Sequence, residues 1–301
     1  PTRGIELGLE LVDAFADAPL SGNAAGVVPD AEGLTEGRMQ AVARELAVSE
    51  TAFLLPAADA DRRVRFFTPT REVDLCGHAT VASHALLHAD GVVEPGEHSL
   101  ATAAGEVTVT VEDDGTTWYA ADRPSVREVD LDYEAAAAAL GVPPVALREV
   151  GRDLAPAVAE AGFPWLLVPV TYLEHLGAAD PDPGAVTALA EAHDAEGVYA
   201  FTFDALAPDS TLHARAFAPG AGIPEDPVTG TASAGVATYL RSRGAVDATG
   251  ELRLEQGHFV DRPGLVRVQV EGTVRVGGPA AVALYVTVQV PAAAGDEIIE
   301  A

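Results

Sequence analysis

The sequence contains no lysine, a single cysteine and no apolar run as long as the roughly 20 residues of a membrane-spanning helix. All 18 basic residues are arginines, which excludes Schiff-base catalysis and covalent pyridoxal phosphate because both need a lysine amine. The lone Cys76 allows no disulfide within the chain. The first residues, Pro1–Gly4, lack a signal-peptide core. We therefore expect a cytoplasmic protein that does not bind membranes.

Positive charge is also scarce: 18 basic residues stand against 46 acidic ones, for a net charge of −28. Nucleic-acid affinity depends on clustered Lys and Arg, so we expect no nucleic-acid partner. Most acidic side chains are expected to form a solvated surface, which is also typical of proteins from a high-salt cytoplasm. The chain has no P-loop, G-x-G-x-x-G or G-x-S-x-G motif, which argues against nucleotide binding and serine hydrolysis.

The stretch Asp74–Thr80, Asp-Leu-Cys-Gly-His-Ala-Thr, precedes an apolar run and predicts a helix from Gly77 to about Ala89. A glycine at a helix start allows close approach of a ligand, and the first helical N–H groups favour an anion. A histidine beside them could move protons near neutral pH. The alternative is an ordinary strand-to-helix turn. A further helix is predicted after Thr35, which is a plausible N-cap.

Internal repetition is the strongest organisational signal in the sequence. The order strand, proline, turn, glycine, helix, glycine occurs twice, about 150 residues apart. The matching stretches are residues 65–69 and 215–219, residues 77–79 and 230–232, Gly91 and Gly244, and residues 52–53 and 200–201. The chain of 301 residues is therefore expected to consist of two related halves, with a boundary in the connection 121–129 and a second helix over 232–241. This alignment places His78 opposite Thr231, and Glu50 opposite Val198.

Three candidate acid–base groups lie beside these turns: Glu50, His78 and Asp226. Glu50 begins an apolar strand, so its carboxyl is expected to be partly removed from water, which suits a general acid–base. The competing interpretation is an exposed glutamate at a strand start, and Asp226 could equally form a turn. The matching positions of the two halves do not carry the same titratable groups. A proton-transfer site between two similar halves would need such an unequal set.

The cysteine and the paired histidines are weaker candidates for catalytic or metal-binding residues. Racemases on duplicated folds commonly use one cysteine from each half, and this chain has only Cys76. A symmetric two-thiol mechanism is therefore excluded, and an inert buried cysteine is the simpler interpretation. His84 and His88 have the i, i+4 spacing of a metal pair, but His78 lies on another face of the same helix. We predict no metal site.

With these residues in view, the chain resembles the PhzF-like phenazine-biosynthesis isomerase family, which has the diaminopimelate-epimerase-like fold. The matching stretches are Val12–Phe15 with Ser21–Asn23, Ser49–Thr51, Asp74–Thr80, Phe217–Pro219 with Gly222–Ala232, and Gln256–Gly257 with Arg262–Pro263. They span nearly the whole chain in order. The resemblance implies an α+β protein of two pseudo-symmetric halves, residues 1–122 and 123–301. Each half would be a curved, mostly antiparallel sheet around a central helix, and the final strand could return to the first half.

The resemblance also implies roles for individual residues in a cleft between the halves. Glu50 would be the proton shuttle, with His78 and Asp226 orienting the substrate and assisting protonation. Ser49 and Gly77 would line the pocket, and Gly230 and Thr231 would present backbone N–H groups to a substrate carboxylate. Phenazine-pathway members usually have Ser at the position of Thr231 and often a small residue at that of Cys76. These departures concern the substrate rather than the fold.

The sequence therefore predicts a cofactor-independent isomerase of a small carboxylate, as in isomerisation of trans-2,3-dihydro-3-hydroxyanthranilate. Two alternatives stay open: a racemase or epimerase with an unsymmetrical acid–base pair including Cys76, and a small-acid binding protein without chemistry. The resemblance makes a homodimer plausible.

Overall fold

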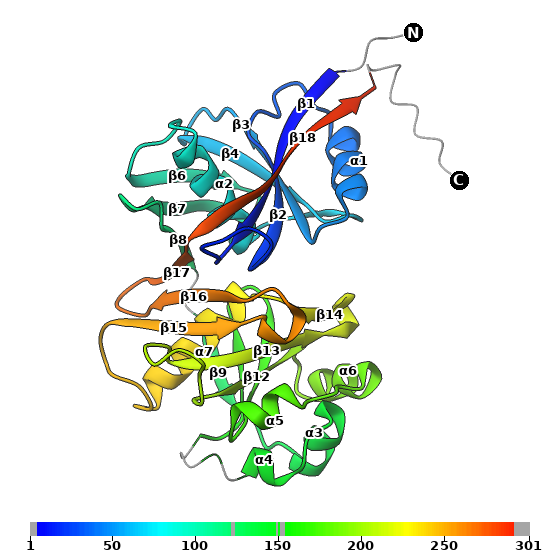
Figure 1. Ribbon diagram of the computed structural model, residues 1–301, viewed down its shortest axis with the longest axis vertical. Helices are drawn as coiled ribbons and strands as arrows, with labels where there is room; N and C mark the ends of the chain where they lie inside the picture. The colour runs from blue at the N-terminus through cyan, green and yellow to red at the C-terminus, as the bar shows by residue number, and fades with distance from the viewer. Residues whose placement is uncertain (1–4, 122–123, 149, 151–153, 292–301) are drawn as a thin grey trace. The chain divides into compact units, whose positions relative to one another are not determined.

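The chain divides into two compact units, and each is described by itself. Unit 1 comprises Pro1–Leu20, Ala24–Thr117 and Pro279–Ala301, and unit 2 comprises Ser21–Asn23 and Trp118–Gly278. The computed structural model (Figure 1) describes residues 5–121, 124–148, 150 and 154–291. Within these residues, no helix is long and apolar enough to cross a membrane.

Unit 1 is a mixed, mostly antiparallel sheet with two helices. Its elements are β1 (Ile5–Ala14), β2 (Asn23–Val28), α1 (Glu36–Leu46), β3 (Glu50–Leu55), β4 (Arg62–Phe67), β5 (Glu72–Val73), α2 (Gly77–Ala89), β6 (Gly96–Thr102), β7 (Gly105–Val111) and β18 (Ala280–Val290). Strand β2 pairs in parallel with β3, β3 and β5 pair antiparallel with β4, β4 pairs in parallel with β6, and β6 pairs antiparallel with β7. The last strand, β18, pairs antiparallel with β1, the first, and Figure 1 shows them side by side in red and blue.

Unit 2 repeats this strand order and adds helices. Its elements are β8 (Thr117–Ala121), β9 (Ser125–Glu128), α3 (Tyr133–Leu140), α4 (Val145–Arg148), β10 (Ala157–Glu160), β11 (Pro164–Pro169), α5 (Leu173–Gly177), α6 (Pro183–Glu191), β12 (Gly197–Thr202), β13 (Leu212–Ala218), β14 (Ile223–Asp226), α7 (Gly230–Ser242), β15 (Glu251–Gln256), β16 (Gly264–Gln269) and β17 (Val274–Gly278), with short 3₁₀ turns at Pro219–Ala221 and His258–Val260. Strand β11 pairs in parallel with β12, β12 and β14 pair antiparallel with β13, β13 pairs in parallel with β15, and β15 pairs antiparallel with β16. The α+β fold class is thereby confirmed.

Each unit has one helix that is buried on most of its surface. Helix α2 packs against β1, β3, β7 and β18, and α7 packs against β9, β10, β11, β16 and β17. Eight of the 13 residues in each helix are buried. A helix that is apolar on nearly all sides belongs inside a core rather than on a surface. These are the central helices that the sequence predicted.

The duplication extends to ion pairs at matching places. Arg65 of β4 makes a two-pronged hydrogen bond with Glu72 of β5. Arg215 of β13 makes the same bond with Glu225 of β14. Each guanidinium also lies over the phenylalanine two residues later, Phe67 or Phe217, at 5.1 and 5.0 Å from the ring centroid. These matching ion pairs and their matching phenylalanines establish which residues of unit 1 correspond to which residues of unit 2.

The strand register corrects the predicted partner of Glu50. Thr51 lies opposite Phe67, and Val198 lies opposite Phe217. Since Phe67 and Phe217 are equivalent, Thr51 matches Val198 and Glu50 matches Gly197. The sequence alignment, which set Glu50 against Val198, was wrong by one residue because residues 52–53 and 200–201 match in type but not in register.

Three local expectations need similar adjustment. Thr35 occupies the N-cap of α1, but its side chain makes no cap hydrogen bond. Helix α7 begins at Gly230, two residues before the predicted start. The predicted connection 121–129 contains a strand, β9, that pairs with β10; residues 122 and 123 lie outside the described residues.

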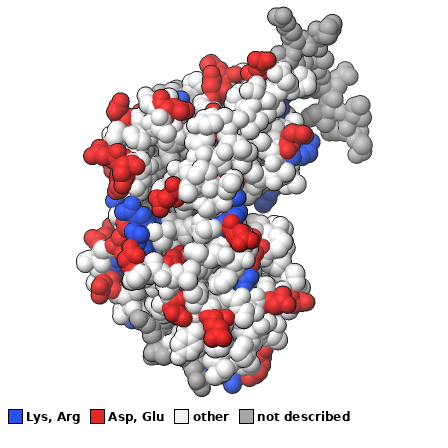
Figure 2. Space-filling view, viewed as in Figure 1, with Lys and Arg blue, Asp and Glu red and all other residues white. Residues whose placement is uncertain are grey.

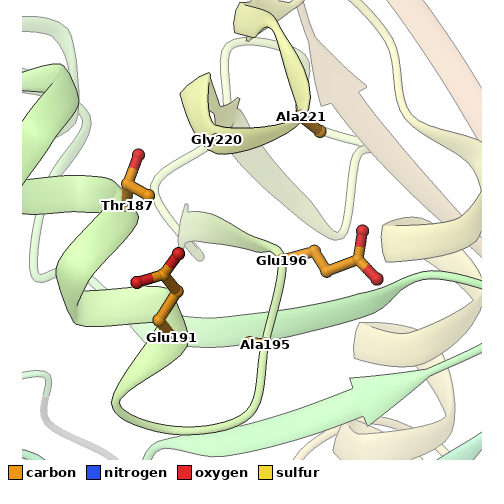
Figure 3. A pocket seen from close by; sticks show the side chains of 6 residues that line it. All are labelled: Thr187, Glu191, Ala195, Glu196, Gly220 and Ala221. Atoms are coloured by element: carbon orange, nitrogen blue, oxygen red, sulfur yellow. The ribbon is translucent and has the colours of Figure 1, made fainter.

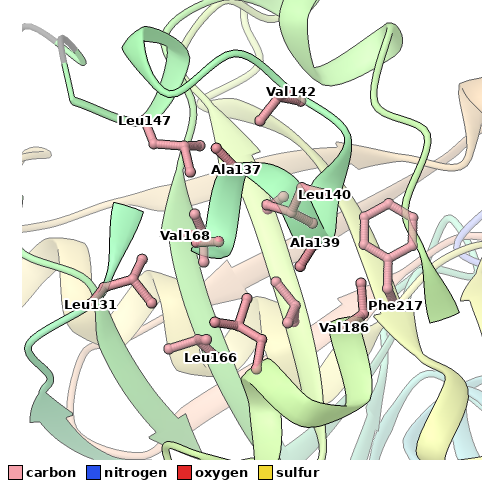
Figure 4. Close-up of a cluster of buried hydrophobic side chains, with 14 of the residues drawn as sticks. Leu131, Ala137, Ala139, Leu140, Val142, Leu147, Leu166, Val168, Val186 and Phe217 are labelled. Atoms are coloured by element: carbon pink, nitrogen blue, oxygen red, sulfur yellow. The ribbon is translucent and has the colours of Figure 1, made fainter. Parts of the chain in front are cut away.

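The apolar packing differs between the units. In unit 1, α1 contributes Met39, Val42 and Ala43 to a cluster that includes Phe53 and Phe67. In unit 2, a larger cluster gathers side chains from α3, α4, α6 and the neighbouring strands (Figure 4). Truncating a fully buried leucine such as Leu166 to Ala is expected to cost about 2–5 kcal/mol. The extra helices therefore give unit 2 a separate layer outside its sheet.

Most acidic side chains lie on the surface, as the charge predicted, whereas Asp13 and Glu255 are buried. Figure 2 shows Asp and Glu side chains dispersed over the face in view, some of them beside Arg side chains. An exposed ion pair is Arg148 with Glu134, 3.0 Å apart, whose side chains are 52% and 63% exposed. Dispersed solvated charge of this kind contributes to solubility rather than to a specific site.

Candidate active site

In unit 1, the start of β3 and the start of α2 bring four polar side chains together. Glu50 Oε2 lies 3.5 Å from His78 Nε2, and Ser49 Oγ lies 3.3 Å from the same nitrogen. Cys76 Sγ lies 3.4 Å from His78 Nδ1 and 3.9 Å from Nε2. Glu50, His78 and Ser49 were predicted site residues, and Gly77 connects two members of the group. We call Ser49, Glu50, Cys76 and His78 the Glu50 cluster.

Local structure explains this placement. Cys76 is the N-cap of α2, with extended dihedrals of φ −141° and ψ 113°, so the chain turns directly from an extended segment into the helix at Gly77. No side chain caps α2, which leaves its first N–H groups without a capping oxygen. Inside the helix, Thr80 donates its hydroxyl hydrogen to the carbonyl of Cys76 at 2.8 Å. The parallel pairing of Ala25 with Glu50 fixes the other side of the cluster.

Burial decides the charge state of the imidazole. The side chains of His78 and Glu50 are only 11% and 20% exposed. Burial lowers the pKa of His78 below its ordinary value of 6.5, and the Glu50 carboxylate opposes that shift without cancelling it. The ring is therefore neutral at pH 7, with one nitrogen as donor and the other as acceptor. A neutral imidazole 3.5 Å from a carboxyl group can exchange a proton with it or orient it.

The same groups are close enough to share a cation. One ligand atom each from Glu50, Cys76 and His78 lies within 4.8 Å of the others, and carboxylate, thiolate and imidazole are zinc ligands. The i, i+4 histidines are engaged elsewhere: His84 Nδ1 lies 3.3 Å from the Thr80 carbonyl and His88 Nδ1 lies 3.1 Å from that of Val93. The Glu50 cluster, rather than His84 and His88, is thus where this part of the chain could hold a metal.

In unit 2, Asp226 lies in a network of hydrogen bonds at the end of β14. Its Oδ1 accepts from Asn23 Nδ2 at 2.9 Å, and its Oδ2 accepts from the Thr229 hydroxyl at 2.6 Å. Gln256 donates to the Asp226 carbonyl at 2.7 Å and accepts from the Thr229 N–H at 3.1 Å. Both carboxylate oxygens therefore accept, as suits an ionised group. We call Asn23, Asp226, Thr229 and Gln256 the Asp226 network.

The start of α7 follows this network directly. Thr229 is its N-cap, with φ −116° and ψ 105°, and makes no side-chain cap bond because its hydroxyl is turned to Asp226. Thr231, in the first turn, accepts a hydrogen bond from the Trp165 indole at 3.0 Å. Gly230 and Thr231 thus begin a helix of 13 residues whose first N–H groups have no side-chain cap.

The predicted site residues therefore fall into two groups by unit. Ser49, Glu50, Gly77 and His78 lie together in unit 1, and Asp226, Gly230 and Thr231 lie together in unit 2. Four residues of the polar networks received no predicted role: Asn23, Thr229, Gln256 and Trp165. The first three stand in the motif stretches 21–23, 222–232 and 256–257, and that was the available signal. Nothing in the sequence marked Trp165.

A surface pocket in unit 2 is separate from these groups. It is lined by Thr187, Glu191, Ala195, Glu196, Gly220 and Ala221, which Figure 3 shows around its opening. None of the predicted site residues lines it, and its two glutamates would repel a carboxylate. The pocket therefore does not fit the substrate class that the sequence predicts.

Comparison with known proteins agrees with these observations. Residues 12–285 match the sequence model of the PhzC-PhzF family, described as phenazine biosynthesis-like protein. A protein from Escherichia coli strain K12, named an uncharacterized isomerase, is 36% identical over 91% of this chain and 92% of its own length. One from Bacillus subtilis strain 168, with the same description, is 35% identical over 86% of this chain and 88% of its own length.

Solved structures give the same result for the fold. A phenazine biosynthesis protein of the PhzF family from Bacillus anthracis has a TM-score of 0.86 at 29% identity, over 95% of this chain and all of that one. A hydroxyproline epimerase from Agrobacterium vitis has a TM-score of 0.61 at 16% identity, over 97% of this chain and 93% of that one. The second likeness bears on the fold alone, and it places the protein among epimerase-like folds, as predicted.

The duplicated strand order, the two central helices and the polar groups at their starts thus occur in a chain whose sequence relatives are isomerases. The protein is an enzyme of the isomerase or epimerase class, and it belongs to the PhzC-PhzF family of phenazine biosynthesis-like proteins.

Proposed function

We propose that this enzyme is a cofactor-independent isomerase that moves a proton between two carbon atoms of a small carboxylate. Glu50, as the carboxylate, removes a proton from an activated carbon, and the electron pair of that C–H bond is delocalised into the adjoining unsaturated system. Glu50 then returns the proton to another carbon of the same molecule. No atom is gained or lost, and the enzyme regains its starting protonation state.

The single observation that supports this proposal most strongly is the contact between Glu50 and His78. Their reacting atoms are 3.5 Å apart, and burial keeps the imidazole neutral at pH 7. A neutral ring can donate to the Glu50 carboxylate when that group is ionised, and accept from it when it is protonated. His78 thus assists both halves of a proton shuttle without itself adding a charge to the site.

The proposal assigns substrate binding to groups of unit 2. The N–H groups of Gly230 and Thr231 would bind the substrate carboxylate, since uncapped helical N–H groups and the helix dipole favour an anion. Asp226, which is an acceptor through both oxygens, would bind an amino or hydroxyl group of the same molecule. Within unit 1, Ser49 and Gly77 would bind the substrate beside Glu50 and His78.

Solvent deuterium exchange tests the proposal. The protein is incubated in D₂O with a panel of cyclic and acyclic carboxylates, including trans-2,3-dihydro-3-hydroxyanthranilate, and the products are followed by NMR. The expected result is deuterium in an isomer whose double bonds have moved. Binding of a carboxylate without any exchange across the panel would instead identify a small-acid binding protein and refute the isomerase.

An epimerase is the second candidate, and it rests on Cys76. The thiol lies 3.4 Å from His78 Nδ1, so Cys76 and Glu50 could serve as the two acid–base groups of an epimerase. This reaction predicts deuterium at the α-carbon of an amino acid, with inversion and no shift of double bonds. It also predicts that Cys76→Ala abolishes exchange, whereas the isomerase mechanism predicts that this variant stays active.

We also propose that the protein forms a homodimer through β18. Leu284 and Tyr285 on this strand are 51% and 75% exposed, and exposed apolar side chains of this size are typical of an interface. Light scattering coupled to size-exclusion chromatography would measure the mass. A monomer at micromolar concentration, or a dimer that Tyr285→Arg leaves intact, would contradict this assignment.

A further inference from the structure

Trp165 donates the hydrogen bond that sets the direction of the Thr231 hydroxyl. Its indole Nε1 lies 3.0 Å from Thr231 Oγ1. An indole N–H can only donate, so the Thr231 oxygen is the acceptor. The hydroxyl hydrogen of Thr231 must therefore point away from Trp165. Among the hydrogen bonds of the described residues, Thr231 Oγ1 donates none.

Hydroxyls elsewhere in the two central helices behave differently. Thr80 of α2 and Ser233 of α7 each donate to the carbonyl four residues earlier, at 2.8 and 2.7 Å, and both residues are buried. Such a bond uses the hydroxyl hydrogen within the helix. Thr231 is half-buried instead, and its oxygen is held from outside the helix, so its hydrogen is available to a solute.

The indole itself is held in place on several sides. Trp165 is only 3% exposed, and its ring packs against Phe163, with the centroids 4.8 Å apart, and against the edge of Tyr199. A Cβ on Gly197 would lie 2.5 Å from the indole ring, so only glycine fits beside it at this position. A donor fixed in this way loses little entropy when it orients a partner.

From these contacts we infer that Trp165 is a positioning residue that aims the Thr231 hydroxyl at an anionic oxygen of the substrate. The inference rests on the proposed function, because it takes the start of α7 as the carboxylate site. It assigns the hydroxyl of Thr231, and not only its backbone N–H, to recognition of that carboxylate. Selection of a carboxylate over a neutral group of the same shape would then depend on a tryptophan in β11.

The experiment measures anion preference by calorimetry, with benzoate and its neutral counterpart benzamide as probes. Trp165→Phe retains a ring in the same place but removes the N–H donor. We expect it to reduce the preference for benzoate by about three- to tenfold, and Thr231→Val to reduce it by about tenfold or more, as suits a hydrogen bond to a charged group. In the Thr231→Val background, Trp165→Phe should have no further effect, whereas Thr231→Ser should preserve the effect of Trp165→Phe.

Trp118→Phe is the matched control, because Trp118 is also buried but lies on β8, in contact with the guanidinium groups of Arg267 and Arg275. It should leave the benzoate preference unchanged. Equal effects of Trp165→Phe with and without the Thr231 hydroxyl would overturn the inference, since a purely structural tryptophan acts independently of that group. Because the readout is binding, the inference can fail while the isomerase stands. With an active substrate, the change should fall on KM more than on kcat.

Discussion

The starts of α2 and α7 share a backbone and differ in nearly every functional side chain. Both helices have 13 residues, begin with glycine after an extended N-cap and lack a side-chain cap. In both, the fourth residue donates its hydroxyl hydrogen to the N-cap carbonyl. Both are followed by a glycine with positive φ, Gly91 at 69° and Gly244 at 63°.

The side chains at matching positions have diverged. Cys76 and His78 of unit 1 correspond to Thr229 and Thr231 of unit 2, and Glu50 corresponds to Gly197. Conversely, Asp226 corresponds to Val73, since each pairs with the equivalent residue of the neighbouring strand. The start of α2 thus carries groups that can transfer protons, and the start of α7 carries groups that donate and accept hydrogen bonds. Under the proposed function, the same backbone serves proton transfer in unit 1 and substrate binding in unit 2.

The largest effect is expected from a variant that removes the carboxyl group of Glu50, the proposed proton carrier. Glu50→Gln should reduce turnover about 10³-fold or more, because an amide cannot act as general acid–base. The side chain is partly exposed, so the melting temperature should change little. Deuterium exchange and circular dichroism measure the two effects. Glu45→Gln makes the same chemical change at an exposed position of α1 and should behave as wild type. Near-native turnover in Glu50→Gln would refute the division of roles.

The duplicated arginine pairs compare the stability of the two units. Arg215 is only 9% exposed, and besides Glu225 it donates to the carbonyls of Leu176 and Ala179. Arg215→Met leaves the half-buried Glu225 carboxylate without its partner and the Leu176 and Ala179 carbonyls without their donor, and should cost about 3 kcal/mol. Arg65→Met, at a site 17% exposed whose partners are more accessible, should cost about 1 kcal/mol. Urea unfolding measures both. Equal losses would show that burial does not distinguish the pairs.

The sequence predicted those features of the fold that depend on local pattern. The glycine starts and apolar runs predicted both central helices, although the start of α7 was placed two residues late. The recurrence of Arg, Phe and Pro in residues 65–69 and 215–219 revealed the duplication. Local pattern cannot give strand register, and the match of residues 52–53 with 200–201 was therefore misleading by one residue.

The site was predictable in part, and for a similar reason. Glu50 and His78 stand in matching motifs, and the structure places them in contact. The bonds from Asn23 to Asp226 and from Trp165 to Thr231 join residues 203 and 66 positions apart. Such contacts depend on the fold as a whole. A tryptophan in an apolar strand gives no sign of its partner, because packing and recognition require the same residue type.

A third comparison concerns pH. His84 of α2 matches Ala237 of α7, so only the helix of unit 1 carries this buried imidazole. Burial lowers the pKa of His84 to about 4, against the opposing effect of its contact with the Thr80 carbonyl. As pH falls, the unfolded chain therefore binds a proton at His84 before the folded chain does. The free energy of unfolding decreases as pH falls from about 6.5 to 4.

The expected loss is about 3 kcal/mol over that interval. His84→Gln keeps a side chain that can bond the Thr80 carbonyl but does not titrate. It should flatten the dependence of unfolding free energy on pH between 6.5 and 4, measured by urea titration at several pH values. His88→Gln, in the same helix, is the control. An unchanged slope in His84→Gln would show that His84 binds protons equally in the folded and unfolded chains and does not cause the pH dependence.

A smaller effect is expected from the groups that hold Asp226. Asn23→Ala removes one hydrogen-bond donor to the Asp226 carboxylate and should lower kcat/KM about tenfold, since a hydrogen bond to a charged group is lost. Thr229→Val removes another. Because both act on one carboxylate, the double variant should lose less than the product of the single losses. Steady-state kinetics with circular dichroism measure this. Strict multiplication of the two effects would mean that the residues act separately.

The last comparison concerns metal binding, for which the smallest effect is expected. The Glu50 cluster offers sulfur, nitrogen and oxygen ligands within 4.8 Å, whereas Thr229 and Thr231 at the matching positions offer none of the soft ligands. If Glu50 works as a free base, treatment with a chelator should leave turnover unchanged. Added Zn²⁺ should inhibit by occupying the carboxylate, and Cys76→Ala should weaken that inhibition because one ligand is lost. If chelation abolished activity and Zn²⁺ restored it, Glu50 would instead be a metal ligand. The starts of α2 and α7 would then differ in metal binding rather than in proton transfer.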